Sequence, residues 1–279
     1  MRRARRLACF LTLACVLGGC HEPTGDSGIT GKAAEVTRIE TAHHSLVVHT
    51  RTSDAGGGDP TLVVLLHGDL PTPPPDYHVR VASEVANRHL GVVAAALLRP
   101  GYGDGSGNTS SGPLGRATGD GYTSEVVDSV AGAIRHLQSE HGARCTVVVG
   151  HSGGGAIAAL VASRHHGLVH QLLVVGCPCD LGAWRVHMGR QRPGVDWDTG
   201  ESLSPIEVAQ DMDPAVAVGV IVGEDDDVAP PAISDSYARE LESQGIRATL
   251  TRLPGAGHNI LTSPRVGELI DAAIAACDR

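Results

Sequence analysis

The sequence has 279 residues, of which 42% are hydrophobic and 3% aromatic, and its formal net charge at pH 7 is −9. This length fits one large domain or two small ones, and the low aromatic content requires a core built from Val, Ala and Leu. The negative charge argues against a nucleic-acid partner, because proteins that bind nucleic acids present positive surfaces to the phosphates.

The first twenty residues predict a signal peptide rather than part of the fold. Arginines stand at positions 2, 3, 5 and 6, and the apolar stretch 7–17 that follows is too short to span a bilayer as a mature helix. The sequence Leu17-Gly18-Gly19-Cys20 resembles the lipobox of bacterial lipoproteins, which implies cleavage before Cys20 and lipidation of its thiol. The alternative is an ordinary secretory signal that is cut nearby. Either way we expect an exported protein, and in the first case one anchored to a membrane of the cell envelope.

A flexible tether is expected after the signal peptide. Residues 21–35 are rich in Pro, Thr, Gly, Asp and Ser, which is typical of a linker. Removal of the signal takes away four arginines and no acidic residue, so the mature chain carries a net charge of −13. The folded domain is then expected to span residues 36–279.

Strands and helices alternate along this domain. Residues 36–51 predict one or two opening strands. Short apolar runs predict buried strands at 61–66, 91–98, 145–149, 169–175, 216–222 and 248–253. Apolar residues at helical spacing predict helices at 76–90, 123–141, 152–165, 231–244 and 264–277. This alternation predicts an α/β fold with a mostly parallel sheet covered by helices on both faces.

One stretch, residues 180–212, breaks the alternation. It contains both tryptophans of the chain together with several Arg, Gly and Pro residues. Insertions in such folds commonly lie over the carboxyl ends of the strands, where ligands bind. We therefore expect a short cap here; the alternative is a long surface connection.

The motif that indicates chemistry most strongly is Gly150-His151-Ser152-Gly153-Gly154, between an apolar strand and an Ala-rich helix. Gly-x-Ser-x-Gly in this context is typical of a nucleophile elbow, where the serine stands at the tip of a strained turn. Side chains two positions before and after the serine would collide, which explains both glycines. The next helix directs its positive end at the reaction site. We predict Ser152 as a nucleophile; the alternative is a purely structural turn.

A serine hydroxyl is a weak nucleophile and needs a base. Among the 15 histidines, position favours His258, which follows the last strand in a glycine-containing loop. Such a loop can bring the imidazole over the serine. His151 is nearer in sequence, but its side chain follows the turn of the elbow and is expected to point elsewhere. Most other histidines are expected in helices or polar strands, in contact with solvent: His43, His44, His136, His165 and His166.

A third group should orient the imidazole. Three adjacent aspartates, Asp225, Asp226 and Asp227, follow the strand at 216–222 and lie between the predicted nucleophile and base in chain order. Asp180, after the preceding strand, is another candidate. The acidic cluster is also compatible with a solvated turn or a weak cation site.

Backbone N–H groups should form an oxyanion hole that stabilises the carbonyl oxygen as it becomes charged. Gly153, next to the predicted nucleophile, supplies one donor. The loop 67–70 after the first core strand can supply the other, from Asp69. An acidic side chain facing the oxyanion would be unfavourable, so we expect that of Asp69 to point away or to contact a positive part of the substrate.

Seven cysteines are present, and Cys145, Cys177, Cys179 and Cys277 remain after the signal peptide and Cys20 are set aside. An even number in an oxidising compartment permits disulfides. A bridge between Cys145 and Cys277 is the first that we expect. The Cys-x-Cys pair is spaced like a metal or redox site, but no second ligand pair with zinc spacing accompanies it, so free thiols or one bridge are favoured over a metal.

Taken together, these motifs resemble the α/β-hydrolase superfamily over nearly all of residues 36–279. The matching segments are His67-Gly68, Arg99-Pro100-Gly101-Tyr102-Gly103, Gly150–Gly154, Gly223-x-x-Asp226-x-Val228-x-Pro230 and Gly257-His258. The resemblance implies a central sheet of about eight strands and a Ser-His-Asp triad, with neither cofactor nor metal. Its Gly-x-x-Asp-x-Val-x-Pro register selects Asp226 from the three aspartates. The His-Gly-Asp loop differs from the Gly-rich loop of many lipases and peptidases, so the resemblance leaves the substrate class open.

The expected reaction is acyl transfer to water, with Ser152 attacking an ester or amide carbonyl, His258 taking its proton and Asp226 stabilising the imidazolium. A carboxylesterase is the first expectation. The second is an aminopeptidase or amidase of the same superfamily, which would bind a free amine through acids near the site. A third is an exported binding protein that retains the fold without turnover. The sequence does not decide the oligomeric state.

Overall fold

The computed structural model of the chain describes residues 34–53, 59–70, 74–197 and 200–278. The predicted signal peptide, Cys20 and nearly all of the predicted tether 21–35 lie outside these residues. Among the helices of the described chain, none is long and apolar enough to cross a membrane.

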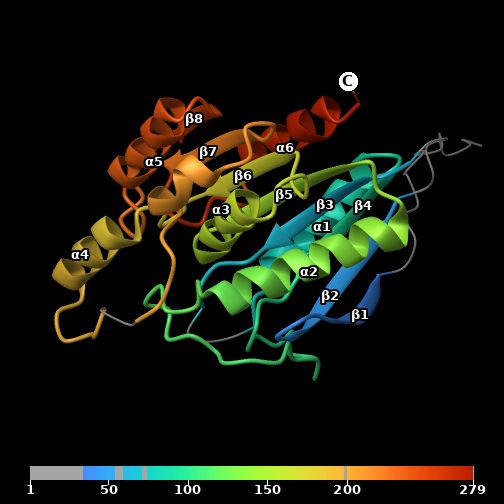
Figure 1. Cartoon of the computed structure of the whole chain (residues 1–279), viewed down its shortest axis with the longest axis horizontal. Helices are drawn as coiled ribbons and strands as arrows, with labels where there is room; N and C mark the ends of the chain where they lie inside the picture. The colour runs from blue at the N-terminus through green and yellow to red at the C-terminus, as the bar shows by residue number, and fades with distance from the viewer. Residues whose placement is uncertain (1–33, 54–58, 71–73, 198–199, 279) are drawn as a thin grey trace, which may run out of the picture.

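The described residues form one sheet of eight strands in the order β1-β2-β4-β3-β5-β6-β7-β8 (Figure 1). The strands are β1 (Glu35–Glu40), β2 (Ser45–Thr52), β3 (Thr61–Leu66), β4 (Val92–Leu97), β5 (Cys145–His151), β6 (Gln171–Val175), β7 (Ala217–Gly223) and β8 (Arg247–Leu253). The β1–β2 and β2–β4 pairs are antiparallel, and the strands from β4 to β8 are parallel. The mostly parallel sheet that the alternation predicts, and the strand number of about eight that the resemblance implies, are therefore confirmed.

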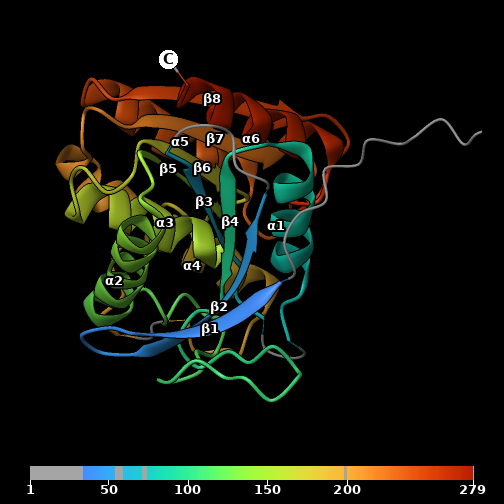
Figure 2. The ribbon, with the colours of Figure 1, turned by 90° about the vertical axis from the view of Figure 1, so that its right-hand side faces the viewer.

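Helices cover both faces of the sheet, as Figure 2 shows. They are α1 (Tyr77–Arg88), α2 (Ser124–His141), α3 (Gly153–Arg164), α4 (Leu181–Gln191), α5 (Pro231–Ser243) and α6 (Pro264–Ala276), with a 3-10 helix η1 (Pro205–Asp211). The apolar faces of α1 and α6 pack on one side of the sheet, and those of α2, α3 and α5 pack on the other. The layered α/β architecture follows from this arrangement.

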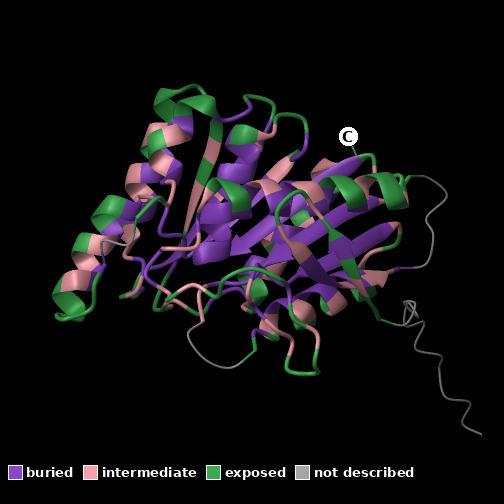
Figure 3. Ribbon diagram, turned by 60° about the horizontal axis from the view of Figure 1, so that its bottom comes forward, coloured by how far each residue is buried: buried purple, intermediate pink, exposed green. Residues whose placement is uncertain are grey.

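Aliphatic side chains of the central strands fill both cores. Along β3, Leu62, Val64 and Leu66 face α2 and α3, whereas Val63 and Leu65 face α1 and α6. All six residues of β3 are buried, as are those of β4 and β5 (Figure 3). A strand buried on both faces reads as a continuous apolar run, which is why the sequence located these strands to within about two residues.

The stretch 180–212 contains α4 and η1, which the sequence analysis did not assign. Trp184 packs edge-to-face on Trp197 with ring centroids 5.5 Å apart, and both indoles are largely buried. Asp180 caps the start of α4 by accepting a hydrogen bond from the Ala183 N–H at 3.0 Å. η1 packs against α3 and α5.

Two disulfides are present among the described cysteines. The expected pair, Cys145 at the start of β5 and Cys277 after α6, is bonded. Cys177 and Cys179, which follow β6, are bonded to each other and buried. The Cys-x-Cys pair is thus a bridge rather than a metal site.

We expect the Cys145–Cys277 bridge to stabilise the domain because it closes a loop across 132 residues and ties the last helix to the central strand. The double variant Cys145→Ser/Cys277→Ser should lose about 2–5 kcal/mol of unfolding free energy, as is typical when a native disulfide is removed. Urea unfolding followed by circular dichroism measures this loss. Cys177→Ser/Cys179→Ser, which opens only a short loop, serves as the control. Free thiols at Cys145 and Cys277 in the unreduced, denatured wild type would contradict this pairing.

Candidate active site

The predicted site residues lie at one end of the sheet. Ser152 follows β5, Asp226 follows β7, and His258 follows β8. The carboxyl ends of these parallel strands meet at the same edge. The chain passes from β3 outward to β4 and then returns to β5 on the other side of β3. Open parallel sheets bind ligands at such a reversal of strand order, so the topology places the site between β3 and β5.

Ser152 stands in a strained turn between β5 and α3. Its φ of 53° and ψ of −124° are unusual for a residue with a side chain. Its N–H donates to the Val175 carbonyl at 2.8 Å, which ties the turn to the end of β6. The backbone therefore holds the serine at the carboxyl edge of the sheet, with the first turn of α3 directly behind it.

The flanking glycines allow the close backbone approach that this turn needs. A Cβ at Gly150 would overlap the Gly154 carbonyl, and a Cβ at Gly154 would overlap the His67 carbonyl. At Gly68 a Cβ would lie 2.9 Å from the Ser152 Cβ. No side chain fits at these positions, which gives the Gly-x-Ser-x-Gly spacing and the His-Gly pair a steric cause.

Asp226 and His258 are hydrogen-bonded to each other. The His258 Nδ1 lies 2.9 Å from Oδ2 and 3.1 Å from Oδ1 of Asp226. The Asp226 side chain is fully buried, and its Oδ1 also accepts the N–H groups of Val228 and Ala229 at 2.9 and 2.8 Å. Three donors thus satisfy this buried carboxylate.

The other acidic candidates occupy different places. Asp225 and Asp227 are exposed, so burial separates Asp226 from its neighbours. Asp180 caps α4 instead of facing the imidazole. Of the three adjacent aspartates, Asp226 is the one whose carboxylate contacts the imidazole of His258.

Two further glycines shape this acid–base pair. A Cβ at Gly223, the last residue of β7, would overlap the carbonyls of Ala256 and Gly257. A Cβ at Gly176, after β6, would lie 3.3 Å from Asp226 Oδ2 and from the His258 ring. Sequence reasoning did not identify Gly176. Its place directly after a buried strand was the available signal, and its φ of +55° is the reason that glycine stands there.

The N–H groups of the loop after β3 differ in whether they have a hydrogen-bond partner. The Gly68 N–H donates to the Tyr77 hydroxyl at 2.6 Å, and the Leu70 N–H donates to the Tyr102 hydroxyl at 3.3 Å. Between them, the Asp69 N–H has no acceptor among the described residues, and the same holds for Gly153 at the start of α3. These two amides, which the sequence predicts as oxyanion donors, are thus available to a ligand.

The Asp69 carboxylate points into the protein. It pairs with the Arg99 guanidinium at 2.7 Å and accepts the Tyr122 hydroxyl at 2.6 Å. Arg99 is buried, with the rings of Tyr102 and Tyr122 5.4 and 5.9 Å from its guanidinium carbon. The negative charge of Asp69 is therefore neutralised beside Gly153, which answers how an acid can occupy this loop.

Three buried histidines surround the site, and each is kept neutral. Burial lowers the pKa of His78 to about 3 and holds the pKa of His67 well below its usual range. Burial and the neighbouring His258 lower the pKa of His151 to about 4. The sequence predicts that the His151 side chain points elsewhere, but its ring lies 5.0 Å from that of His258 and packs inside the site. The sequence did not single out His78, because nothing marks a buried histidine within a helix.

Helix α4, within the stretch 180–212, contacts the turn that carries Asp226. The Trp184 indole donates to the Val228 carbonyl at 2.8 Å, and the His187 ring lies 2.7 Å from the Asp227 carbonyl. Arg185 reaches across to the Gly119 carbonyl at 3.0 Å. α4 is thus attached both to the turn that carries Asp226 and to the loop before α2.

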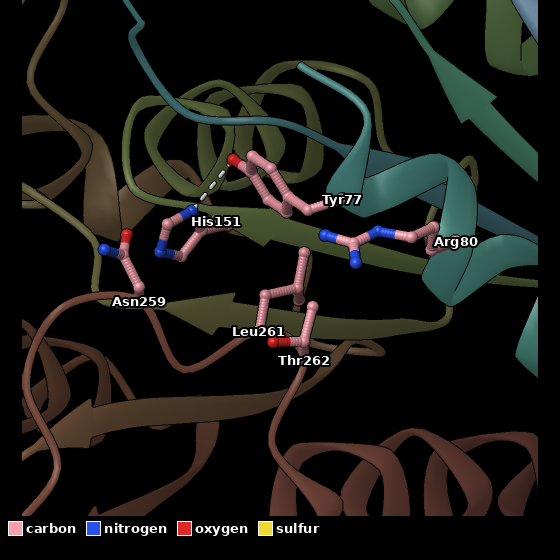
Figure 4. Close-up of a pocket in the computed structure, with 6 residues that line it drawn as sticks. All are labelled: Tyr77, Arg80, His151, Asn259, Leu261 and Thr262. Atoms are coloured by element: carbon pink, nitrogen blue, oxygen red, sulfur yellow. Dashed lines mark hydrogen bonds between the residues drawn. The ribbon is translucent and has the colours of Figure 1, made fainter.

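A small pocket of about 190 Å³ opens beside His151. Figure 4 shows its walls: Tyr77 and Arg80 from α1, His151, and Asn259, Leu261 and Thr262 from the loop after β8. Among the described residues, no group of three or more His, Cys, Asp or Glu side chains is placed to hold a metal ion.

This architecture is the α/β-hydrolase fold, and comparison with solved structures supports the assignment. A puromycin-hydrolysing peptidase of Mycobacterium tuberculosis matches with a TM-score of 0.63 and 16% identity over 88% of this chain, which spans 39% of the peptidase. A carboxyl esterase of Bacillus coagulans matches at 0.61 and 13% identity, covering 87% of this chain and 99% of the esterase. Est1E of Butyrivibrio proteoclasticus, solved with ferulic acid, matches at 0.63 and 15%, covering 86% and 99%. No protein-family model and no curated protein matches the sequence.

We expect the fold to be sensitive to acid because these histidines are buried in their neutral form. Well above pH 6.5, the ordinary pKa of histidine, they are neutral in both the folded and the unfolded chain. Below it the unfolded chain binds protons that the folded protein does not accept until about pH 4 at His151 and about pH 3 at His78. The free energy of unfolding should then fall by up to about 1.4 kcal/mol per pH unit for each histidine, which urea titrations from neutral pH to about pH 5 measure.

The variant His78→Leu provides the control for this pH dependence. It removes one titrating group while keeping an apolar side chain of similar size in the core. As the pH is lowered, its free energy of unfolding should fall less steeply than that of the wild type. The slope should be smaller by up to about 1.4 kcal/mol per pH unit. A slope equal to that of the wild type would contradict the assignment of neutral His78.

Proposed function

We propose that the protein is a serine hydrolase that cleaves a carboxylic ester through an acyl-enzyme. Ser152 attacks the carbonyl carbon, and His258 takes the hydroxyl proton and returns it to the leaving alcohol. Asp226 holds the Nδ1 proton of His258 and stabilises the imidazolium. The N–H groups of Gly153 and Asp69 stabilise the oxyanion, and water then releases the acid by the same steps.

One observation carries this proposal. A buried carboxylate, satisfied by three donors, is hydrogen-bonded to an imidazole at the sheet edge where a serine occupies a strained turn. A structural aspartate at a solvated turn would not need a histidine partner, and strain at a non-glycine residue is typical of functional sites. The two unpaired amides beside the serine add the remaining part of an acyl-transfer site.

An ester is favoured over a peptide with a free amino terminus. An aminopeptidase needs an accessible acid to bind the amine. Asp69, the acid of the oxyanion loop, is already paired with Arg99 and Tyr122, and Asp226 is buried against His258. Peptide or amide cleavage stays the second candidate because one of the similar structures is a peptidase.

Active-site labelling tests the reaction class. We expect a fluorophosphonate probe to label the folded wild type, and Ser152→Ala to abolish labelling. With p-nitrophenyl acetate, Ser152→Ala and His258→Ala should lower kcat by about 10⁴-fold or more, and Asp226→Asn by about 10⁴-fold. Asp225→Asn, which changes an exposed neighbour, should leave kcat within about two-fold of the wild type.

The outcomes separate the candidates. Folded wild type that resists the probe would point to a binding protein on this fold and refute the triad. Faster turnover of amino-acid anilides than of p-nitrophenyl esters would replace the esterase with the peptidase or amidase.

We also propose that the mature protein is a lipoprotein attached to a membrane of the cell envelope through Cys20, with the domain facing outward from the cytoplasm. The basic and apolar segments before Leu17-Gly18-Gly19-Cys20 support this placement. Its substrate is then a small ester outside the cytoplasm, and the net charge of −13 disfavours nucleic acid as a partner.

Mass spectrometry of the mature amino terminus checks the anchor. We expect a lipid-modified Cys20 as the first residue, and we expect the protein to fractionate with membranes. The Cys20→Ser variant should yield no lipidated protein. Since a single acyl chain binds a membrane only marginally, stable attachment requires more than one acyl group. An unmodified protein that begins at another residue would refute the anchor.

A further inference from the structure

Three consecutive hydrogen bonds join the loop after β3 to the loop after β8. The Gly68 N–H donates to the Tyr77 hydroxyl at 2.6 Å, and this hydroxyl lies 2.9 Å from His151 Nδ1. The His151 Nε2 lies 3.0 Å from the His258 carbonyl oxygen. Figure 4 shows the Tyr77 hydroxyl directed at the His151 ring. We call this chain of groups, from Gly68 through Tyr77 and His151 to His258, the strut.

Every proton in the strut has one possible place. The His258 carbonyl can only accept, so His151 Nε2 carries a hydrogen. The neutral imidazole then accepts at Nδ1, and the proton comes from the Tyr77 hydroxyl. The Tyr77 oxygen in turn accepts the Gly68 N–H. The depressed pKa of His151, about 4, keeps the ring neutral, and burial raises the pKa of Tyr77 to about 12, which keeps its proton in place.

Each end of the strut lies next to a group of the proposed reaction. Gly68 precedes Asp69, whose N–H is the proposed oxyanion donor from this loop. The carbonyl at the other end belongs to His258 itself. Its centre, His151, precedes Ser152 in the elbow, and a Cβ at Gly68 would lie 3.4 Å from His151 Nδ1. The strut therefore connects donor, nucleophile and base, which three separate strands supply.

We propose that Tyr77 and His151 are positioning residues of the acyl-transfer site, which hold the Asp69 N–H at a fixed distance from His258. They act through Gly68 and through the His258 carbonyl. Among the described residues, no backbone hydrogen bond joins the loop after β3 to the loop after β8, so side chains supply the connection between these two loops. This inference rests on the proposed function.

The variant Tyr77→Phe tests it, since it keeps the ring and removes only the hydroxyl. Loss of that hydroxyl leaves the Gly68 N–H and His151 Nδ1 without their partners. We expect kcat for p-nitrophenyl acetate to fall by about ten- to a hundred-fold while KM changes less than about two-fold, because positioning acts on the transition state. The rate of fluorophosphonate labelling should fall in parallel.

Tyr237→Phe is the matched control. Tyr237 is a fully buried tyrosine in α5 whose hydroxyl has no partner among the described residues. Its variant should keep the wild-type kcat, whatever its effect on the unfolding midpoint. His151→Asn is the second variant: its side chain is too short to reach the His258 carbonyl, and it should reproduce the kcat loss if Tyr77→Phe does not fold.

The two proposals fail in different ways. If the wild type is not labelled by fluorophosphonate, the proposed function fails. If the wild type is labelled and a folded Tyr77→Phe or His151→Asn keeps kcat within about five-fold, the strut has no positioning role and the proposed function stands. An equal loss of kcat in Tyr237→Phe would also overturn the inference, because the effect would then follow from removing any buried hydroxyl.

Discussion

The strained backbone at Ser152 is the constraint on which the rest of the site depends. A non-glycine residue with φ near +53° costs about 1–3 kcal/mol and persists only where its surroundings hold it. Here β5 and α3 are buried almost throughout, and the elbow is closed against the carbonyl at the end of β3. Only glycines allow that approach. The fold thereby places Ser152 where the strand order of the sheet reverses, and the base, the acid and the amide donors have to be positioned around it.

The charges beside this elbow leave the positive amino-terminal end of α3 available to a ligand. Asp69 lies close to Gly153, where an unpaired carboxylate would oppose negative charge on a substrate oxygen. The Arg99 guanidinium neutralises that carboxylate, and the Tyr122 hydroxyl donates a hydrogen bond to it. Burial keeps the nearby rings of His67 and His151 neutral. The buried carboxylate of Asp226 is hydrogen-bonded to His258. Pairing between side chains and burial thus set the charges around the elbow.

A parallel sheet brings the loops together at one edge but does not by itself fix the distances between them. In this protein, hydrogen bonds between segments fix these distances. They join Ser152 to the end of β6, Asp226 to His258, and Gly68 to His258 through the strut. α4 adds a further connection between the turn after β7 and the loop before α2. A site supported in this way keeps its geometry while its segments remain separate in sequence.

The sequence by itself determined the α/β class, the strand and helix order, and the elbow, because buried parallel strands read as apolar runs and a sharp turn demands glycine at defined spacings. The residues alone left three adjacent aspartates and Asp180 as candidates for the acid, and the family resemblance selected Asp226. In the structure, burial and a hydrogen bond to His258 distinguish Asp226 from its exposed neighbours. The tertiary structure alone decided the direction of Asp69, the helices in 180–212, the Cys177–Cys179 bridge, and the surroundings of Tyr77, His78 and Gly176. These features depend on contacts between distant segments, and no local pattern in a single chain records which distant residues will meet.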